Sequence, residues 1–150
     1  MNILLATFKG HTMPVWDVHF NPSGLYFLSG GADGMVVLWK TDNPKPQRIF
    51  NHQRDIYKVQ FAKNPEFAFA AGEEGILFIY NLVHATVEKQ IHLGTSIFNF
   101  NLGHSGIYIA IITTEGKVIV HNIQQGLTLG SFYFHFQTSK DPCSKKQNIH

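Results

Sequence analysis

Residues 29–40 read SGGADGMVVLWK, and the pattern returns at a constant offset of 41 residues as AAGEEGILFIYN over 70–81 and IITTEGKVIVHN over 111–122. Each copy has an acidic residue followed by glycine, and then an apolar run that closes on a ring side chain. A period of about 40–45 residues with several short apolar runs is typical of the four-stranded blades of a β-propeller. Helical repeats would need a 3.6-residue apolar period over about ten positions, which the sequence lacks. The sequence therefore predicts an all-β partial propeller of about three four-stranded antiparallel blades.

Alternation of apolar and polar residues predicts the first strand of each repeat. In the first repeat it covers about residues 15–20, and the matching segments lie around 57–61 and 98–102. The side chains expected to face the core are Trp16, Val18 and Phe20, and those expected on the opposite face are Asp17 and His19.

The remaining strands follow from apolar runs and turns. Near-continuous apolar runs predict central strands covered on both faces when blades stack, at 25–29, 67–71 and 107–112. The acid-Gly step predicts a tight hairpin turn, because glycine accepts positive φ, and the third strands follow it at 35–39, 76–80 and 118–121. The outer strands are predicted at 48–50, 87–91 and 127–132.

The predicted domain is one repeat array over residues 1–132. Its repeats lie at about 4–44, 45–85 and 86–126, and a last outer strand follows at 127–132. Residues 3–8 share the phase of an outer strand, so we expect the chain to open with a strand of a blade that it does not otherwise contain. Residues 133–150 are polar and aperiodic, which predicts a disordered tail.

Composition favours an intracellular soluble protein. The formal net charge of +2 is spread over the repeats. Because direct binding to nucleic acid would call for a clustered basic face, we do not expect it. The single cysteine, Cys143, fits a reducing compartment, and no run reaches the roughly 18 apolar residues of a membrane span. The nine histidines show no closely spaced ligand pairs, so we expect neither a metal site nor a cofactor.

A set of polar residues in the first repeat resembles the WD40 repeat. The set comprises Gly10-His11, Ser29, Asp33 and Trp39. The resemblance implies a buried hydrogen-bonded chain with a structural role, in which each polar group is the partner of the next. A hydrolase triad of the same His, Asp and Ser is the alternative, but no G-x-S-x-G nucleophile elbow accompanies it. We therefore expect no enzymatic activity.

The same network positions change in the later repeats. The second repeat has His52, Ala70, Glu74 and Tyr80, of which the histidine, the glutamate and the tyrosine are expected to be structural. The third repeat has Leu93, Ile111, Glu115 and His121. Two polar positions have become apolar there, so His121 would lack its usual partners. We expect the third repeat to be the least stable.

The stretch from Gly10 to Phe50 has a narrower resemblance. Its matching elements include Gly10-His11, Pro14-Val15-Trp16-Asp17, Ser29-Gly30-Gly31 and Arg48-Ile49-Phe50, of which the Pro-Val-Trp-Asp and Arg-Ile-Phe elements are the specific parts. These elements resemble the propeller of the WD40 subunits of the general transcription factor TFIID, whose close relatives serve the SAGA coactivator. The resemblance implies a divergent or shortened member of that family: a nuclear scaffold without catalysis that docks histone-fold TBP-associated factors.

Five residues are candidate partner contacts. Trp16, Tyr57 and Phe98 share one phase at the inner end of the first strand, near the channel rim. Large aromatic side chains at a rim are good anchors for protein partners, but the same phase also fits packing in the core. Asp17 and Glu73 are expected to face the channel or the binding face.

Three repeats are too few to close a propeller, because closed propellers typically have about 4–8 blades. Apolar faces would stay open at both ends, which predicts self-association to complete the ring or membership of a longer propeller. Two other interpretations remain open: a WD40 adaptor of another complex, such as a ubiquitin ligase, and a non-functional truncated product.

Overall fold

The computed structural model describes residues 3–133, and this part of the chain contains twelve β-strands and no helix. The strands form three four-stranded antiparallel sheets, each with its strands in chain order. The prediction of an all-β fold with three such blades is confirmed. The predicted disordered tail, from residue 134 onward, lies outside the described residues, and the repeat boundaries stay a prediction.

The sheets are called blades 1, 2 and 3 below. Blade 1 contains β1 (Val15–Phe20), β2 (Tyr26–Gly31), β3 (Met35–Lys40) and β4 (Asn43–Asn51). Blade 2 contains β5 (Ile56–Phe61), β6 (Phe67–Gly72), β7 (Ile76–Asn81) and β8 (Thr86–His92). Blade 3 contains β9 (Ile97–Leu102), β10 (Tyr108–Thr113), β11 (Lys117–Asn122) and β12 (Leu127–Tyr133).

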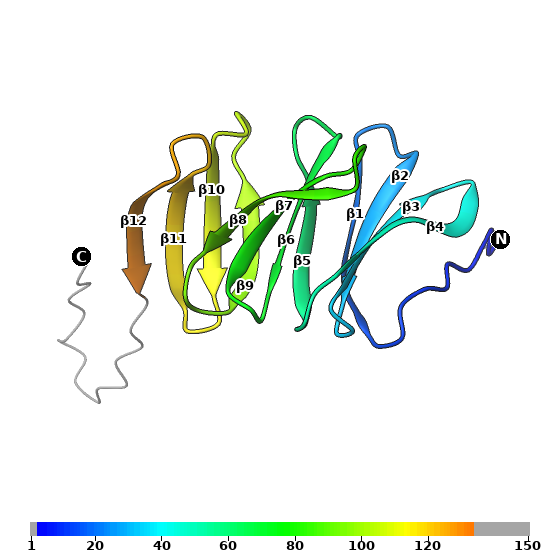
Figure 1. The fold of residues 1–150 in the computed structure, drawn as a ribbon, viewed down its shortest axis with the longest axis horizontal. Coiled ribbons are helices and arrows are strands. Elements are labelled where there is room, and N and C mark those ends of the chain that lie inside the picture. The colour runs from blue at the N-terminus through cyan, green and yellow to red at the C-terminus, as the bar shows by residue number, and fades with distance from the viewer. Residues whose placement is uncertain (1–2, 134–150) are drawn as a thin grey trace.

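The blades stand side by side in chain order, with two hydrophobic cores between them (Figure 1). We call the face that a blade turns toward the preceding blade its N-side face, and the face toward the following blade its C-side face. The first core joins the C-side face of blade 1 to the N-side face of blade 2, through Leu28, Val36, Leu38 and Phe50 against Val59, Phe61, Phe78 and Tyr80. The second core joins blade 2 to blade 3 through Phe69, Leu77 and Ile91 against Ile97, Phe100 and Ile111.

The acid-Gly hairpin turns form as predicted. Gly34, Gly75 and Gly116 all have positive φ, at 74°, 70° and 79°. At Gly34 a side chain would also collide with the carbonyl oxygen of His52. Glycine therefore allows both the left-handed backbone and the close approach of the next loop.

The predicted outer strand at 3–8 is wrong, because residues 3–10 form no strand. An outer strand needs the third strand of its own blade as a hydrogen-bonding partner, and the described chain has no such strand before β1. The segment nevertheless packs on blade 1. The Phe8 ring lies 5.0 Å from the Phe27 ring and 5.5 Å from the Trp39 ring, edge to face in both cases.

Each first strand carries an extra residue that alternation did not predict. In β1, Val15 pairs with Gly31 and Asp17 with Gly30, so Trp16 is the extra residue of a β-bulge. Tyr57 in β5 and Phe98 in β9 occupy the same bulge. Because a bulge interrupts the two-residue period and re-aims a side chain, these aromatics are out of step with the core-facing positions. The prediction that Trp16 points into the core with Val18 and Phe20 is therefore wrong.

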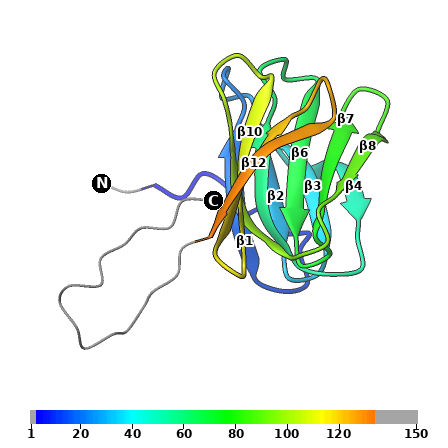
Figure 2. The same ribbon diagram turned by 90° about the vertical axis from the view of Figure 1, so that its left-hand side faces the viewer.

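Two blade faces are open at the ends of the stack. On the N-side face of blade 1, Val18 and Phe20 are exposed, although alternation predicted them to be core residues. In β10 the residues alternate between exposed and buried, so the prediction of cover on both faces is wrong for blade 3. Figure 2 looks onto this end of the stack, where β10 and β12 face the viewer. In each case the described chain has no adjacent blade to cover the face.

Candidate functional site

His11, Ser29, Asp33 and Trp39 form one hydrogen-bonded chain in blade 1. His11 comes from the loop before β1, Ser29 from β2, Asp33 from the β2–β3 turn and Trp39 from β3. The His11 Nδ1 atom lies 2.9 Å from Asp33 Oδ2, and its Nε2 atom lies 2.6 Å from Ser29 Oγ. The indole N–H of Trp39 donates to Ser29 Oγ at 2.8 Å. The chain ties the loop to β2, to the β2–β3 turn and to β3.

The carboxylate of Asp33 is held ionised by this network. Burial alone would raise its pKa, but the Thr12 amide, the His11 side chain and the Met35 amide donate to it and bring the pKa below its usual value. Because a carboxylate only accepts hydrogen bonds, His11 donates through Nδ1 and accepts the Ser29 hydroxyl proton at Nε2. Every polar atom along the chain therefore has a partner.

The Ser-His-Asp connectivity matches that of a hydrolase triad, but the surroundings do not. Ser29 is only 3% exposed, and its Oγ already accepts the Trp39 N–H. A nucleophile must reach a carbonyl carbon, and donors must face the oxyanion that forms. The arrangement instead fits a structural lock, since the serine is enclosed between two fixed partners.

Blade 2 builds a shorter version from the predicted residues His52, Glu74 and Tyr80. Ala70 replaces the serine, and the Tyr80 hydroxyl lies 2.6 Å from His52 Nε2. Burial lowers the pKa of His52, with the Glu74 carboxylate opposing it, so the neutral ring accepts the tyrosine proton. Glu74 Oε1 accepts the Gln53 amide, as Asp33 accepts that of Thr12.

Blade 3 leaves the network incomplete. His121 is buried, its Nδ1 atom lies 3.3 Å from Thr128 Oγ1, and its Nε2 atom has no hydrogen-bond partner among the described residues. Burial, followed by the charge of Lys89, lowers the pKa of His121. A buried polar atom without a partner is costly, so this site weakens blade 3 relative to blades 1 and 2.

The three bulge aromatics mark a rim near the β2–β3 and β6–β7 turns. Trp16 and Phe98 are 53% and 60% exposed, and Tyr57 is partly buried. The Trp16 indole donates to Asp55 Oδ2 at 3.0 Å and lies edge to face with Tyr57, with 6.5 Å between ring centres. The rim thus offers apolar rings beside a carboxylate on rigid strand ends.

Acidic groups surround Tyr57. Burial raises the pKa of its hydroxyl, and the charges of Asp55 and then Glu73 raise it further. The Glu73 side chain is exposed, while its backbone carbonyl accepts the Ser96 hydroxyl at 2.8 Å. Sequence reasoning missed Asp55 as a site residue. Its place in the loop two residues before the bulge aromatic is the signal that could have found it.

Asp17, predicted as a partner contact, is engaged inside the protein. Its Oδ2 atom accepts the Val59 amide at 3.0 Å and lies 3.4 Å from Lys58 Nζ. The structure therefore places Asp17 at the junction of blades 1 and 2, apart from the exposed rim rings.

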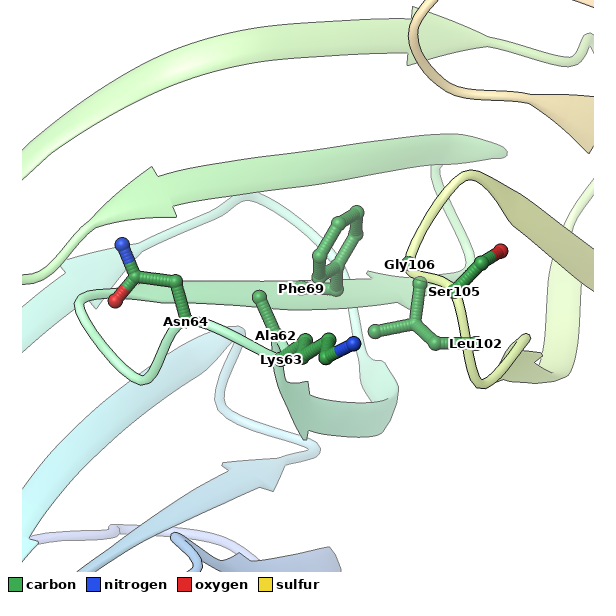
Figure 3. Close-up of a pocket in the computed structure, with 7 residues that line it drawn as sticks. All are labelled: Ala62, Lys63, Asn64, Phe69, Leu102, Ser105 and Gly106. Atoms are coloured by element: carbon green, nitrogen blue, oxygen red, sulfur yellow. The ribbon is translucent and has the colours of Figure 1, made fainter.

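A hollow of the described surface lies away from the rim. A shallow pocket of about 430 Å³ is lined by Ala62, Lys63, Asn64, Phe69, Leu102, Ser105 and Gly106. Figure 3 shows the Lys63 side chain extending across this pocket toward Leu102. The loops that line this pocket connect the first and second strands of blades 2 and 3. The rim residues lie at the other end of the first strands. Residues 3–133 contain no cluster of three or more potential metal ligands and no helix long and apolar enough to cross a membrane.

Comparison with known proteins agrees with this geometry. Residues 2–40 match the family model described as WD domain, G-beta repeat. The C-terminal WD40 domain of Sif2 has the same fold, with a TM-score of 0.71 at 22% identity over 79% of this chain and 34% of that one. The first repeat is thus a WD40 repeat, and the described chain has the WD40-type fold. Its His-Ser-Asp-Trp lock and its three blades belong to that architecture.

Three relatives are similar to parts of this chain. Dynein axonemal intermediate chain 4 of Homo sapiens is 34% identical over 89 residues, which cover 58% of this chain and 10% of the relative. Eukaryotic translation initiation factor 3 subunit I of Vanderwaltozyma polyspora is 23% identical, covering 91% of this chain and 45% of the relative. Small ribosomal subunit protein RACK1 of Brassica napus is 34% identical, covering 59% and 27%. The chain spans less than half the length of each.

Proposed function

We propose that this WD40 chain is a non-enzymatic protein-interaction scaffold. The observation that carries the proposal is the rim of Trp16, Tyr57, Phe98, Asp55 and Glu73, which sets exposed aromatic rings beside carboxylates on a rigid sheet. Aromatic side chains held in place by a scaffold are the usual anchors of protein interfaces. The one Ser-His-Asp group of the described chain is enclosed and structural, which supports a role in binding over one in catalysis.

We further propose that the scaffold works in the nucleus as a subunit of a transcription initiation or coactivator complex of the TFIID or SAGA type. Its partners would be histone-fold TBP-associated factors. The support is the resemblance of the segment from Gly10 to Phe50, which includes the rim residue Trp16 and the lock residues His11, Ser29 and Asp33.

A second placement is favoured by the relatives. Two of them are named as a translation initiation factor subunit and an axonemal dynein chain. The same rim would then bind a subunit of a cytoplasmic or axonemal assembly.

Affinity purification of the tagged chain from separate nuclear and cytoplasmic extracts, followed by mass spectrometry, tests both placements. The first predicts TBP-associated factors from the nuclear extract. A double variant, Trp16→Ala with Phe98→Ala, should lose them. Leu129→Ala should keep them, because Leu129 is a comparably exposed apolar residue on β12, away from the rim. Recovery of initiation-factor, dynein or ubiquitin-ligase subunits instead would overturn the transcription placement, and capture that is unaffected by the double variant would overturn the role of the rim.

A further inference from the structure

We propose that the two open faces of the blade stack bind each other between two copies of this chain, which close head to tail into a six-bladed ring. The C-side face of blade 3 in each copy would cover the N-side face of blade 1 in the other. This inference does not depend on which partner the rim binds.

The open faces use the same repeat positions as the two junctions already formed. The C-side face of blade 2 buries Phe69, Ala71, Leu77, Ile79 and Ile91. At an offset of 41 residues, blade 3 presents Ala110, Ile112, Val118, Val120 and Phe132. Ile112 and Phe132 are exposed there. On the N-side face, blade 1 presents Val15, Val18 and Phe20 where blade 2 buries Ile56, Val59 and Phe61. The new contact would therefore continue an existing type of interface.

Side-chain sizes on the two open faces differ from those at the formed junction in opposite directions. At the junction of blades 1 and 2, Gly30 is so close that an added Cβ would lie 2.6 Å from Ile56 Cγ2 and 2.9 Å from Val59 Cγ1. Blade 3 has the larger Ile112 at the Gly30 position, and blade 1 has the smaller Val15 at the position of Ile56. In this exchange the larger side chain stands on the blade 3 face, whereas at the junction of blades 1 and 2 it stands on the N-side face.

At a second pair of positions the exchange runs the other way, with the smaller side chain on blade 3 and the larger one on blade 1. At the junction of blades 1 and 2, Leu28 belongs to the same core as the small Ala68. Blade 3 has the small Ala110 at the Leu28 position, and blade 1 has the large Phe27 at the Ala68 position. A partner unrelated to this repeat would have no reason to match both exchanges.

The polar contacts across the junctions are also repeated. Asp17 accepts the Val59 amide, His19 Nδ1 accepts the Phe61 amide at 3.2 Å, and Gln60 Oε1 accepts the Leu102 amide at 3.4 Å. The corresponding acceptors in blade 3 are Asn99 and Asn101, and the corresponding amides in blade 1 are those of Val18 and Phe20. Asn99 Oδ1 already accepts the Phe100 amide of its own chain at 2.8 Å, but an amide oxygen has two lone pairs and can accept a second N–H. The contact brings together no like charges at these positions.

Two copies give six blades, within the range of about 4–8 in which propellers close. Three copies would give nine. A head-to-tail contact that repeats by a fixed rotation forms a closed ring when the rotation closes, and otherwise an open filament. In a ring of two copies, both open faces of each chain are covered.

The N-terminal segment must move aside for this contact. Residues 127–133 follow residues 4–10 by three repeat lengths, so the two segments are at equivalent positions of the repeat. In the ring, β12 of the second copy would therefore occupy the place that residues 4–10 now take. Phe50 of blade 1 packs 4.3 Å from the Tyr80 ring of blade 2, and the matching pair would be Phe132 of one copy with Trp39 of the other. Phe8 now covers Trp39, while Ile3, Leu4 and Leu5 are largely exposed and weakly held.

Size-exclusion chromatography with light scattering on the purified 150-residue chain is the test. The expected mass is twice 17.0 kDa, falling to the monomer on dilution. Val18→Asp and Ile112→Asp should each weaken association at least about tenfold, since each would bury an unpaired carboxylate. Val83→Asp is the matched control, because Val83 is as exposed as Val18 but lies on neither face, and it should associate like the parent.

Circular dichroism of the variants at dilute concentration should show the parent's strand content, because Val18, Val83 and Ile112 are all exposed in the monomer. Removal of residues 2–8 should strengthen association several-fold by freeing Trp39. A monomer at all concentrations, an open polymer, or a dimer insensitive to either Asp variant would overturn the ring. Unchanged or weaker association after the truncation would overturn the placement of β12 on Trp39.

Discussion

Blades 1 and 2 place equivalent residues on their N-side faces, but only blade 2 buries them. Val18 and Val59 occupy the same repeat position, yet Val18 is 58% exposed and Val59 is 0% exposed. Phe20 and Phe61 differ in the same way, at 57% and 5%. Strand type, pairing and bulge are the same in the two blades, so the difference comes from the neighbouring blade. In this fold the core belongs to the junctions between blades, and a strand becomes hydrophobic core only when another sheet covers it.

The same substitution at both positions should reveal the largest difference between the two blades. Val59→Asp should reduce the free energy of unfolding by more than about 4 kcal/mol, because a carboxylate would be buried between two blades without a partner. Val18→Asp should change it by no more than about 1 kcal/mol. Urea unfolding at a concentration low enough to keep the chain monomeric measures both. Equal losses at the two positions would contradict the assignment of the core to the junctions.

The locks of the two blades can be compared through Ser29, which blade 2 replaces with Ala70. Ser29→Ala should cost about 2 kcal/mol, since it removes partners from the buried Trp39 N–H and from His11 Nε2. The control is Ser105→Ala, in an exposed loop, which should stay within about 0.5 kcal/mol. A neutral Ser29→Ala would show that the serine bridge does not stabilise blade 1.

Blade 3 extends the comparison to an incomplete lock. His121→Phe should raise the free energy of unfolding by about 1 kcal/mol, because the buried Nε2 atom now has no partner in the described chain. Thr128→Val tests the remaining contact to Nδ1 and should have little effect, given its 3.3 Å length. Destabilisation by His121→Phe would mean that the imidazole is satisfied in solution.

The smallest expected effect is a dependence of stability on pH. Burial lowers the pKa values of His19, His52 and His121 in the folded chain. The unfolded chain therefore binds protons first as pH falls below about 6.5, and stability should decline from there down to the lowered folded pKa values. The lowered pKa of Asp33 adds a separate loss below its ordinary range, where the folded carboxylate finally protonates.

Thermal melts between about pH 7.5 and 5.5 measure the histidine contribution. His52→Gln should flatten the profile, because glutamine can still accept the Tyr80 hydroxyl but does not titrate. Ser105→Ala, at an exposed loop position and without a titrating group, is the control and should keep the parent's profile. A steeper profile in His52→Gln would reverse the sign assigned to His52.

Much of the fold could be predicted from the repeat. The second strands β2, β6 and β10 begin within one residue of the predicted positions, because each is an apolar run bounded by a turn. The acid-Gly turns were equally predictable, since only glycine adopts their positive φ at little cost. The four residues of the blade 1 lock could be named as a set because the first repeat resembles the WD40 repeat, in which these polar groups are each other's partners.

The rim was only partly predictable. Trp16, Tyr57 and Phe98 could be picked out by phase, but alternation alone could not decide between packing and exposure. The answer depends on a bulge, which is a property of how the first strand pairs with the second. Asp17 and Asp55 show the same limit: their partners lie 39–42 residues away on the neighbouring blade.

The blades follow from the 41-residue period, because short apolar runs separated by glycine turns satisfy their backbone hydrogen bonds as repeated four-stranded sheets. Which of the equivalent apolar faces are core depends on how the blades stack. Local pattern is the same in every blade, whereas burial requires a second sheet about 10 Å away, and the described chain supplies one for only two of the three N-side faces.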